Sequence, residues 1–173
     1  MGGAWAQTPT PPANGNGDVD TPYIITKAEE LAWFRNQVNG GKNKICAKIA
    51  DNVEVIDMST VCHAADKSQN LEEKSWVPIG NRNIIKYRGT FDGNGKTISN
   101  LYINASQENM GLFGYILDST IKNLTLEDAN VTNMSNYTGI LVGKTFAENT
   151  LQNIKISRME TPIVRSANTY FQK

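Results

Sequence analysis

The chain lacks several features that whole classes of protein require. Its 17 basic and 17 acidic residues cancel, so no field of one sign attracts nucleic acid or an anionic membrane surface. The longest apolar runs, such as 139–142, cover only a few residues, whereas a membrane-spanning helix needs about 20. His63 is the only histidine, which leaves a zinc site almost without support. We therefore expect no nucleic-acid partner, no membrane span, no metal and no cofactor.

Cysteine is also scarce. The two cysteines, Cys46 and Cys62, do not belong to a Cys-x-x-Cys motif. In a secreted chain they can pair, and the closed loop contributes about 3 kcal/mol to stability in the chain-entropy model. The alternative is two free thiols, buried separately. The sequence does not decide between the disulfide and the free thiols.

The N-terminus lacks the apolar stretch of a complete secretory signal. Residues 1–3 lead directly into Ala4-Trp5-Ala6, whose small residues two positions apart suit cleavage by a signal peptidase. We interpret this start as the remnant of a signal, the alternative being an unrelated start with a chance match. The next segment, 8–22, is rich in Pro, Gly, Asn and Thr, so residues 1–22 are predicted to be a signal remnant and flexible spacer.

One amphipathic helix is predicted over residues 27–39. Thr26 and Glu29 have the spacing of a capping box, in which each side chain satisfies a backbone N–H at the start of the helix. Gly40 and Gly41 end the helix, because glycine adopts the left-handed conformation without steric cost. Apolar side chains recur at helical spacing along it: Leu31, Phe34 and Val38.

Beyond the helix, short patterns repeat. Segments 98–103, 121–126 and 151–156 each read apolar-x-Asn-apolar-x-apolar, and two glycine-bounded elements, 111–114 and 139–143, precede the later copies. A unit this small can bury its apolar face only against a neighbouring unit. Asparagine suits a corner because it tolerates left-handed geometry. We expect nine apolar side chains to be buried in stacked parallel strands: Ile98, Leu101, Ile103, Ile121, Leu124, Leu126, Leu151, Ile154 and Ile156.

These patterns predict an all-β fold, a short right-handed parallel β-helix (solenoid) with one N-terminal capping α-helix. The strand and helix of 23–41 form the cap, and the repeats occupy 42–173. The helix is expected to cover the open end of the apolar column. The tail, 158–173, has no second amphipathic helix, so end-to-end self-association through the last unit is also predicted.

The residues of the repeat region resemble a known family. The runs 76–80 and 87–98, together with the glycine-bounded elements, are similar to the GLUG-motif repeat proteins, which are large secreted or surface proteins common in gut Bacteroidetes. The resemblance covers about residues 23–157. It implies a right-handed β-helix, a bacterial secreted or cell-surface location, and an adhesive or scaffolding role without catalytic residues. The chain is shorter than such proteins, so we expect it to be part of a larger surface protein, the alternative being a minimal unit with an unusual C-terminal cap.

Two function classes remain open. The first is a non-catalytic interaction or adhesion module whose partner is an unknown protein or glycan, with Tyr102 and Tyr137 as the aromatics that contact a sugar. The second is a carbohydrate-active β-helix, such as a polysaccharide lyase or hydrolase, which needs two carboxylates about 5–10 Å apart in a groove. The candidate carboxylates are Asp92, Asp118, Glu127, Asp128 and Glu148. Only Glu127 and Asp128 are close in sequence, and strand neighbours point to opposite faces.

Asp92 and Asn94 belong to a glycine-rich motif, 91–95, that also invites a calcium interpretation. A calcium loop needs six or more oxygen ligands, and carboxylates at the right spacing do not follow. We predict a tight glycine turn instead.

Overall fold

The computed structural model describes residues 8–81 and 84–157, which are mostly β-strands with one α-helix. The elements up to the middle of the chain are β1 (Tyr23–Ile25), α1 (Ala28–Asn39), β2 (Ala47–Ile49), β3 (Val55–Asp57) and two short 3-10 helices (Met58–Thr60 and Lys67–Gln69). The elements that follow are β4 (Thr90–Ser99), β5 (Tyr102–Ala105), β6 (Phe113–Leu117), β7 (Thr120–Glu127), β8 (Asn130–Asn133), β9 (Val142–Phe146) and β10 (Thr150–Ser157).

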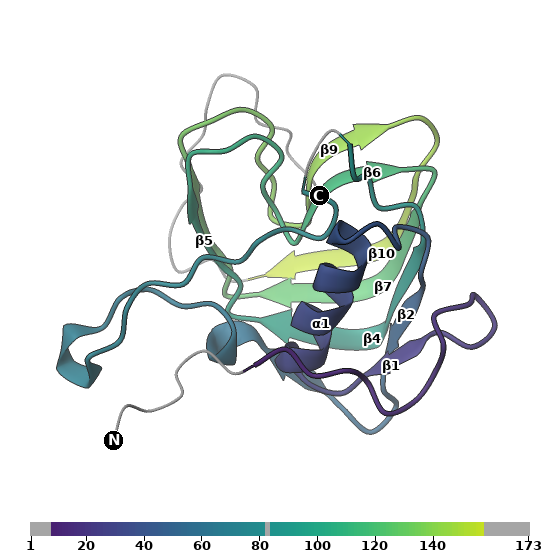
Figure 1. Ribbon diagram of the computed structural model, residues 1–173, viewed down its shortest axis with the longest axis horizontal. Coiled ribbons are helices and arrows are strands. Elements are labelled where there is room, and N and C mark those ends of the chain that lie inside the picture. The colour runs from purple at the N-terminus through teal and green to yellow at the C-terminus, as the bar shows by residue number, and fades with distance from the viewer. Residues whose placement is uncertain (1–7, 82–83, 158–173) are drawn as a thin grey trace.

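The strands form three parallel sheets. The largest has the order β1-β2-β4-β7-β10, with β3 also paired to β4, and the others are the pairs β5-β8 and β6-β9. The chain therefore visits the three sheets in one order through β4, β5 and β6, and in the same order again through β7, β8 and β9. We call each such pass a coil. The all-β class with one helix and the parallel pairing are confirmed, and stacked coils of this kind fit a β-helix (Figure 1).

The register corrects one part of the predicted repeat. Phe91 pairs with Ile121, and Ile121 pairs with Leu151, so β7 and β10 are offset by 30 residues throughout their pairing. Ile98 pairs with Leu126 and not with Ile121, so segment 98–103 is not equivalent to the other two copies. The cause is that segment 98–103 runs from the end of β4 into β5, whereas 121–126 and 151–156 lie inside β7 and β10. Separately, the register shifts at a bulge between Asp92 and Lys96, where β4 carries extra residues. The first copy begins at Phe91, and its pattern was hidden by that bulge.

The corner asparagines do stack. Asn153 Nδ2 donates to Asn123 Oδ1 at 2.9 Å, and Asn123 Nδ2 donates to Asp92 Oδ1 at 3.1 Å. Asn123 and Asn153 have φ of 56° and 53°, the left-handed region that asparagine tolerates better than most residues. The side-chain ladder thus satisfies polar groups at a bend inside β7 and β10. Asn100, also left-handed, lies at the next corner, where its Nδ2 donates to Asp57 Oδ1 at 3.0 Å.

The predicted core residues are buried in the first two copies of the pattern but not in the third. Six of the nine predicted core residues are buried: Ile98, Leu101, Ile103, Ile121, Leu124 and Leu126. The third copy is not, since Leu151 is 40% exposed and Ile154 and Ile156 are half-buried. The physical reason is position: within the described residues β10 pairs with β7 on one side and with no strand on the other. The predicted tail, 158–173, lies outside the described residues.

A column of glycines lets neighbouring coils approach closely. Ile79 bridges to Phe113, which pairs with Val142, so Gly80, Gly114 and Gly143 follow one another across the stack. A Cβ on Gly114 would lie 2.5 Å from the Asn109 carbonyl oxygen and 2.7 Å from that of Gly80. These contacts explain the glycine-bounded elements of the sequence, because a side chain there would push the coils apart.

Helix α1 begins differently from the prediction. Thr26 donates from its backbone N and from Oγ1 to Glu30 Oε2, at 2.6 and 2.9 Å. Glu30, and not Glu29, is therefore the residue that reaches back, and its side chain is 5% exposed. The predicted capping box is wrong by one position. The reason is that the helix starts at Ala28 with Lys27 as its N-cap, and the Lys27 side chain makes no capping bond.

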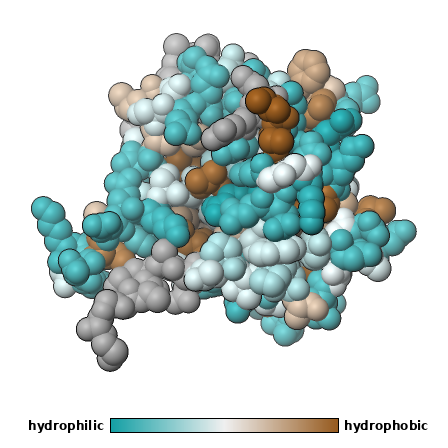
Figure 2. Space-filling model, viewed as in Figure 1, coloured by the Kyte–Doolittle hydropathy of each residue, from teal (hydrophilic) through white to brown (hydrophobic). Residues whose placement is uncertain are grey.

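The buried stripe of α1 packs on the start of the stack. Phe34 is fully buried, and its ring centroid lies 6.0 Å from that of Tyr87 and 6.3 Å from that of Phe91. Phe91 in turn contacts Phe113 edge-on at 5.4 Å, which joins the helix to the apolar column. In Figure 1 the helix lies in front of the outline traced by the coils. Figure 2 shows this face as largely hydrophilic, with apolar atoms in separate spots. The helix thus covers the column at this end.

The described part of the predicted flexible spacer is docked on the domain. Thr10 N donates to Glu29 O at 3.1 Å, and Cys46 N donates to Gly17 O at 2.7 Å. Gly15 and Gly17 have φ of 91° and 89°, which lets residues 8–22 turn back along the first strands. The composition that suggested disorder serves here to make turns.

Replacing Phe34 with Asp tests the cap. The change puts an unpaired carboxylate among Tyr87 and Phe91, so we expect a loss of about 3–5 kcal/mol in unfolding free energy and more association of the exposed ends. Thermal unfolding and analytical sedimentation measure both. Asn36→Asp adds the same charge at an exposed position of the helix and is expected to change neither. Equal stability and equal monomer content for Phe34→Asp and the unmodified chain would contradict the cap.

Candidate binding surface

Tyr102, a predicted glycan-contacting residue, is half-buried at the start of β5. It lines a pocket of about 220 Å³ beneath the 59–64 segment. The remaining lining residues are Ser59, Cys62, His63, Ala64, Asn100, Leu101, Asp128 and Asn130. Burial raises the pKa of the Tyr102 hydroxyl, and the charge of nearby Glu73 adds to the shift. The ring is therefore partly enclosed by residues of the 59–74 segment, and only part of it can reach a ligand.

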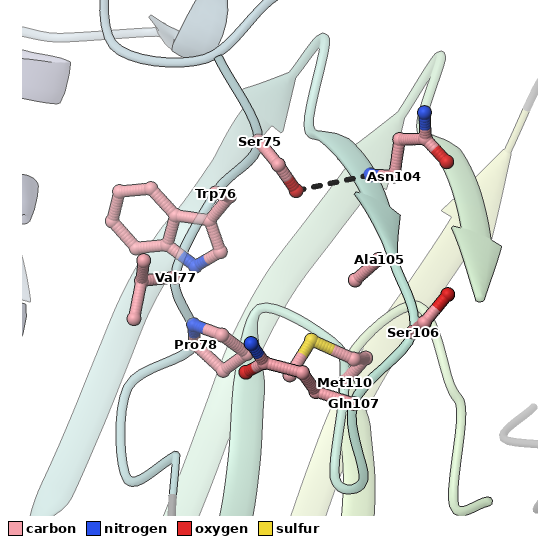
Figure 3. A pocket seen from close by; sticks show the side chains of 9 residues that line it. All are labelled: Ser75, Trp76, Val77, Pro78, Asn104, Ala105, Ser106, Gln107 and Met110. Atoms are coloured by element: carbon pink, nitrogen blue, oxygen red, sulfur yellow. Dashed lines mark hydrogen bonds between the residues drawn. The ribbon is translucent and has the colours of Figure 1, made fainter. Parts of the chain in front are cut away.

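A second hollow, of about 330 Å³, lies further along β5. Figure 3 shows it between the 75–78 segment and the 104–110 segment, with Ser75 facing Asn104 across one end. Asn104 N donates to Ser75 Oγ at 3.0 Å. Proline at position 78 has no N–H to continue this pairing, so the two segments separate there. The lining is uncharged: Ser75, Trp76, Val77, Pro78, Asn104, Ala105, Ser106, Gln107 and Met110.

Trp76 does not offer its face to this groove. Its indole is buried, its Nε1 donates to Leu112 O at 3.1 Å, and the Arg35 guanidinium lies 4.4 Å from the ring centroid. Burial lowers the pKa of Arg35 to about 10. Trp76 is thus a structural contact between the helix and the coils.

Tyr137, the other predicted glycan-contacting residue, lies in the turn between β8 and β9. Its φ of 62° is unusual for a bulky side chain and costs about 1–2 kcal/mol. A fully buried asparagine, Asn133, holds this turn: its Nδ2 donates to Thr138 Oγ1 at 2.7 Å and to Gln107 O at 2.9 Å. Met110 N also donates to Tyr137 O at 3.0 Å. The turn therefore presents the Tyr137 ring from a fixed backbone.

A basic and aromatic ladder runs beside Tyr137. Lys144 Nζ lies 4.4 Å from the Tyr137 ring centroid and 5.0 Å from that of Tyr115, and Lys86 Nζ lies 4.9 Å from the Tyr115 centroid. Tyr115 pairs with Lys144 in the β6–β9 register. Cations over ring faces are attracted by the quadrupole of the ring. Sequence reasoning missed Lys86 and Lys144, because only the register brings them to Tyr115.

The structure does not bring Tyr102 and Tyr137 together. Tyr102 belongs to the sheet β5-β8 and the pocket beside it, while Tyr137 belongs to the turn that leads into β9. Neither of the two hollows described above contains both. They are two separate positions on the surface.

The cysteines form no disulfide, so the free-thiol alternative describes this structure. Both are buried and free. Cys46 Sγ accepts from Thr90 N and Cys62 Sγ accepts from Tyr102 N, each at 3.3 Å. Each thiol therefore takes the place of a backbone carbonyl as the acceptor for an N–H of a neighbouring segment. Burial raises the pKa of the Cys62 thiol to about 11.

Three of the five candidate carboxylates lie opposite residues of other kinds. Asp92 pairs in register with Lys48 and Lys122, and its carboxylate lies 4.0 Å from Lys122 Nζ. Asp118 forms an ion pair with Arg88 at 3.4 Å. Glu127, in β7, has serines as its register partners: Ser99 in β4 and Ser157 in β10. The described ladders thus set none of these three carboxylates directly opposite another.

The glycine-rich motif is a bulge inside β4, and not the separate tight turn that the sequence predicted. Asp92 Oδ1 accepts from Asn94 N at 2.8 Å, and Asn94 Nδ2 donates to Asp51 Oδ1 at 2.7 Å. Asn94 and Gly95 have φ of 54° and 73°. Within residues 8–81 and 84–157, no group of three or more His, Cys, Asp or Glu side chains could hold a metal ion.

The chain matches two long proteins over most of its own length. It is 35% identical over 147 residues to "Halomucin" of Haloquadratum walsbyi, which covers 83% of this chain but 2% of that protein. It is 30% identical over 122 residues to a "Putative Gly-rich membrane protein" of Evansella cellulosilytica, which covers 69% of this chain and 12% of that protein. No protein-family profile matches the chain, and no solved structure matches it. Of the described helices, none is long and apolar enough to cross a bilayer.

The buried thiol predicts a loss of stability in alkaline solution. The pKa of Cys62 rises from 9.0 to about 11 on folding, so between these values the unfolded chain binds fewer protons than the folded one. Stability is therefore expected to fall as pH rises from 9 to 11, by up to about 1.4 kcal/mol per pH unit for this group. Urea unfolding at several pH values measures it. Cys62→Ala removes this contribution, so an equal alkaline slope in that variant and the unmodified chain would contradict the assignment.

Proposed function

We propose that the chain is a non-catalytic interaction module outside the cell, built as a right-handed parallel β-helix and carried within a longer surface protein. The observation that carries the proposal is the parallel stacking of two complete coils, with β2, β3, Ile79 and Tyr87 paired on one side of them and β10 on the other. Connections between parallel strands of a sheet are right-handed in about 98% of cases, which supports the predicted handedness. A stack of this kind is stiff and displays its corner turns at regular intervals.

The relatives support a place within a longer protein. The chain spans 2% and 12% of the two proteins that it matches, so in both the similar region is a small part of the whole. The name of one of them places that protein at a membrane. We therefore propose a surface or secreted location for this chain. Its bacterial origin and its membership of the GLUG-motif repeats remain predictions from the sequence.

The binding role rests on the geometry of the corners. Asn133 holds a strained turn that presents Tyr137, and the uncharged groove beside β5 offers amide and hydroxyl groups over an apolar floor. Polar groups above apolar surface suit a glycan or a protein loop. The alternative, a carbohydrate-active enzyme, needs converging carboxylates. The pairing of Asp92 with lysines and of Asp118 with Arg88 favours the non-catalytic proposal.

Protease treatment of intact cells that express the full-length parent protein tests the location. We expect peptides of this chain to be released from the surface, while a cytoplasmic marker stays protected. A reducing-end and unsaturated-uronate assay on a panel of polysaccharides tests catalysis in parallel, and no products are expected. Release only after lysis would contradict the location, and turnover abolished by Asp92→Asn would favour the enzyme.

The exposed edge of β10 predicts self-association of the isolated chain. Leu151 is 40% exposed on β10, which has a strand on only one side within the described residues. We expect the average mass in sedimentation to rise with concentration, and Leu151→Lys to weaken the association because a charge blunts a strand edge. Val55→Lys replaces an exposed apolar residue on β3 and serves as the control. A monomer at every concentration would contradict this prediction.

A further inference from the structure

We propose that Lys144 and Phe146 of β9, with Tyr137 beside them, form a subsite for a linear polysaccharide that carries carboxylates. The inference rests on the proposed function and names the ligand class of one of its surfaces. It starts from register: Tyr115 pairs with Lys144, and Leu117 pairs with Phe146. Side chains two positions apart on a strand share a face, so Lys144 and Phe146 project from the same side of the sheet about 7 Å apart.

Lys144 carries a positive charge that no carboxylate neutralises within the described residues. The ion pairs there involve other lysines and Arg88, and the contacts of Lys144 are with the rings of Tyr137 and Tyr115. The two rings restrict the side chain without satisfying the hydrogen-bonding capacity of its ammonium group, which has three donors. A half-buried, positioned ammonium of this kind can bind an anionic group with less entropic cost than a free surface lysine.

Phe146 supplies an exposed apolar face beside that charge. It is 59% exposed, which is unusual for so large an apolar side chain. A pyranose ring has an apolar C–H face, and a uronic acid also carries a carboxylate on the same ring. The ring on Phe146 and the carboxylate at Lys144 are therefore the two contacts that one uronic acid residue can make together.

The positive charge recurs along the stack, which favours a polymer over a single sugar. Lys86 also lies over the Tyr115 ring. Its backbone belongs to the coil on the other side of Tyr115 from Lys144, since Tyr87 bridges to Ile116 and Lys144 pairs with Tyr115. Two strand spacings separate the backbone positions of Lys86 and Lys144, which is about 9.6 Å. A linear polysaccharide with carboxylates at regular intervals can follow this direction. An acidic peptide lacks the flat sugar face that Phe146 would contact.

Polygalacturonate tests the proposal, because its fully methyl-esterified form has the same backbone without the charge. Binding of the intact chain is measured by affinity electrophoresis and calorimetry. We expect the acid form to bind and the ester not to bind, and we expect Lys144→Gln to weaken binding by about two- to fivefold, the range of one exposed ion pair. Lys144→Arg should retain most of the affinity. Lys155→Gln removes an equal charge from an exposed position on β10 and should have little effect.

The aromatic residues are tested separately. Phe146→Ser removes the exposed ring, and Tyr137→Asn removes the other ring while keeping a residue that tolerates the left-handed backbone, so neither variant should unfold. Both are expected to weaken binding of polygalacturonate. Equal binding of the ester, an equal loss for Lys155→Gln and Lys144→Gln, equal binding of poly-glutamate with the same dependence on Lys144, or no binding at all would each overturn the inference. None of these results would decide the surface location, which the protease experiment tests independently.

Discussion

The structure depends on the burial of each coil against the coil before it. A single pass through β4, β5 and β6 has one apolar face and nothing of its own to cover it, so the face becomes a core only when β7, β8 and β9 repeat the pass in register. Parallel hydrogen bonds fix the spacing, and the inward side chains of successive strands then meet in a column. The same need for burial explains the position of α1 and the partial exposure of β10. A column must be closed at its ends, and α1 closes one of them through Phe34.

The corners of the coils contain the strained backbone conformations of this fold. Each coil must bend sharply, and the bends use left-handed residues: Asn123 and Asn153 inside β7 and β10, and Asn100 between β4 and β5. Asparagine has a low conformational cost in the left-handed region, and its side chain offsets part of that cost by hydrogen bonding between coils. Tyr137, like Ala147, departs from this pattern, since its side chain does not favour the left-handed region. Tyr137 is the bulky case. Asn133 stabilises the turn of Tyr137 by a hydrogen bond to Thr138. The backbone strain therefore lies at a turn that presents an aromatic ring at the surface.

Much of the fold could be predicted from the sequence because its signals are local. The spacing of Leu31, Phe34 and Val38 predicted the helix within one residue of its observed start, and the recurring asparagines predicted parallel stacking. Register was harder. Two different corners carry similar patterns, and the bulge between Asp92 and Lys96 displaces the first copy. Glu30 and Glu29 differ by only one position, so the sequence could not say which reaches Thr26. The role of Lys144 could not be predicted from its neighbours in the sequence, because the rings that it contacts belong to another coil and to a turn.

The offset of 30 residues between β7 and β10 has a mechanical consequence. Thirty residues in extended form span about 100 Å, but one coil adds only about 4.8 Å to the height of the stack. A coil that peels away under tension therefore lengthens the molecule about twentyfold relative to its folded contribution. Peeling would start at β10, the least buried of the long strands, and each step would break one row of hydrogen bonds while leaving the coils below intact. A chain of such coils would yield to a pulling force in increments and absorb work at each one.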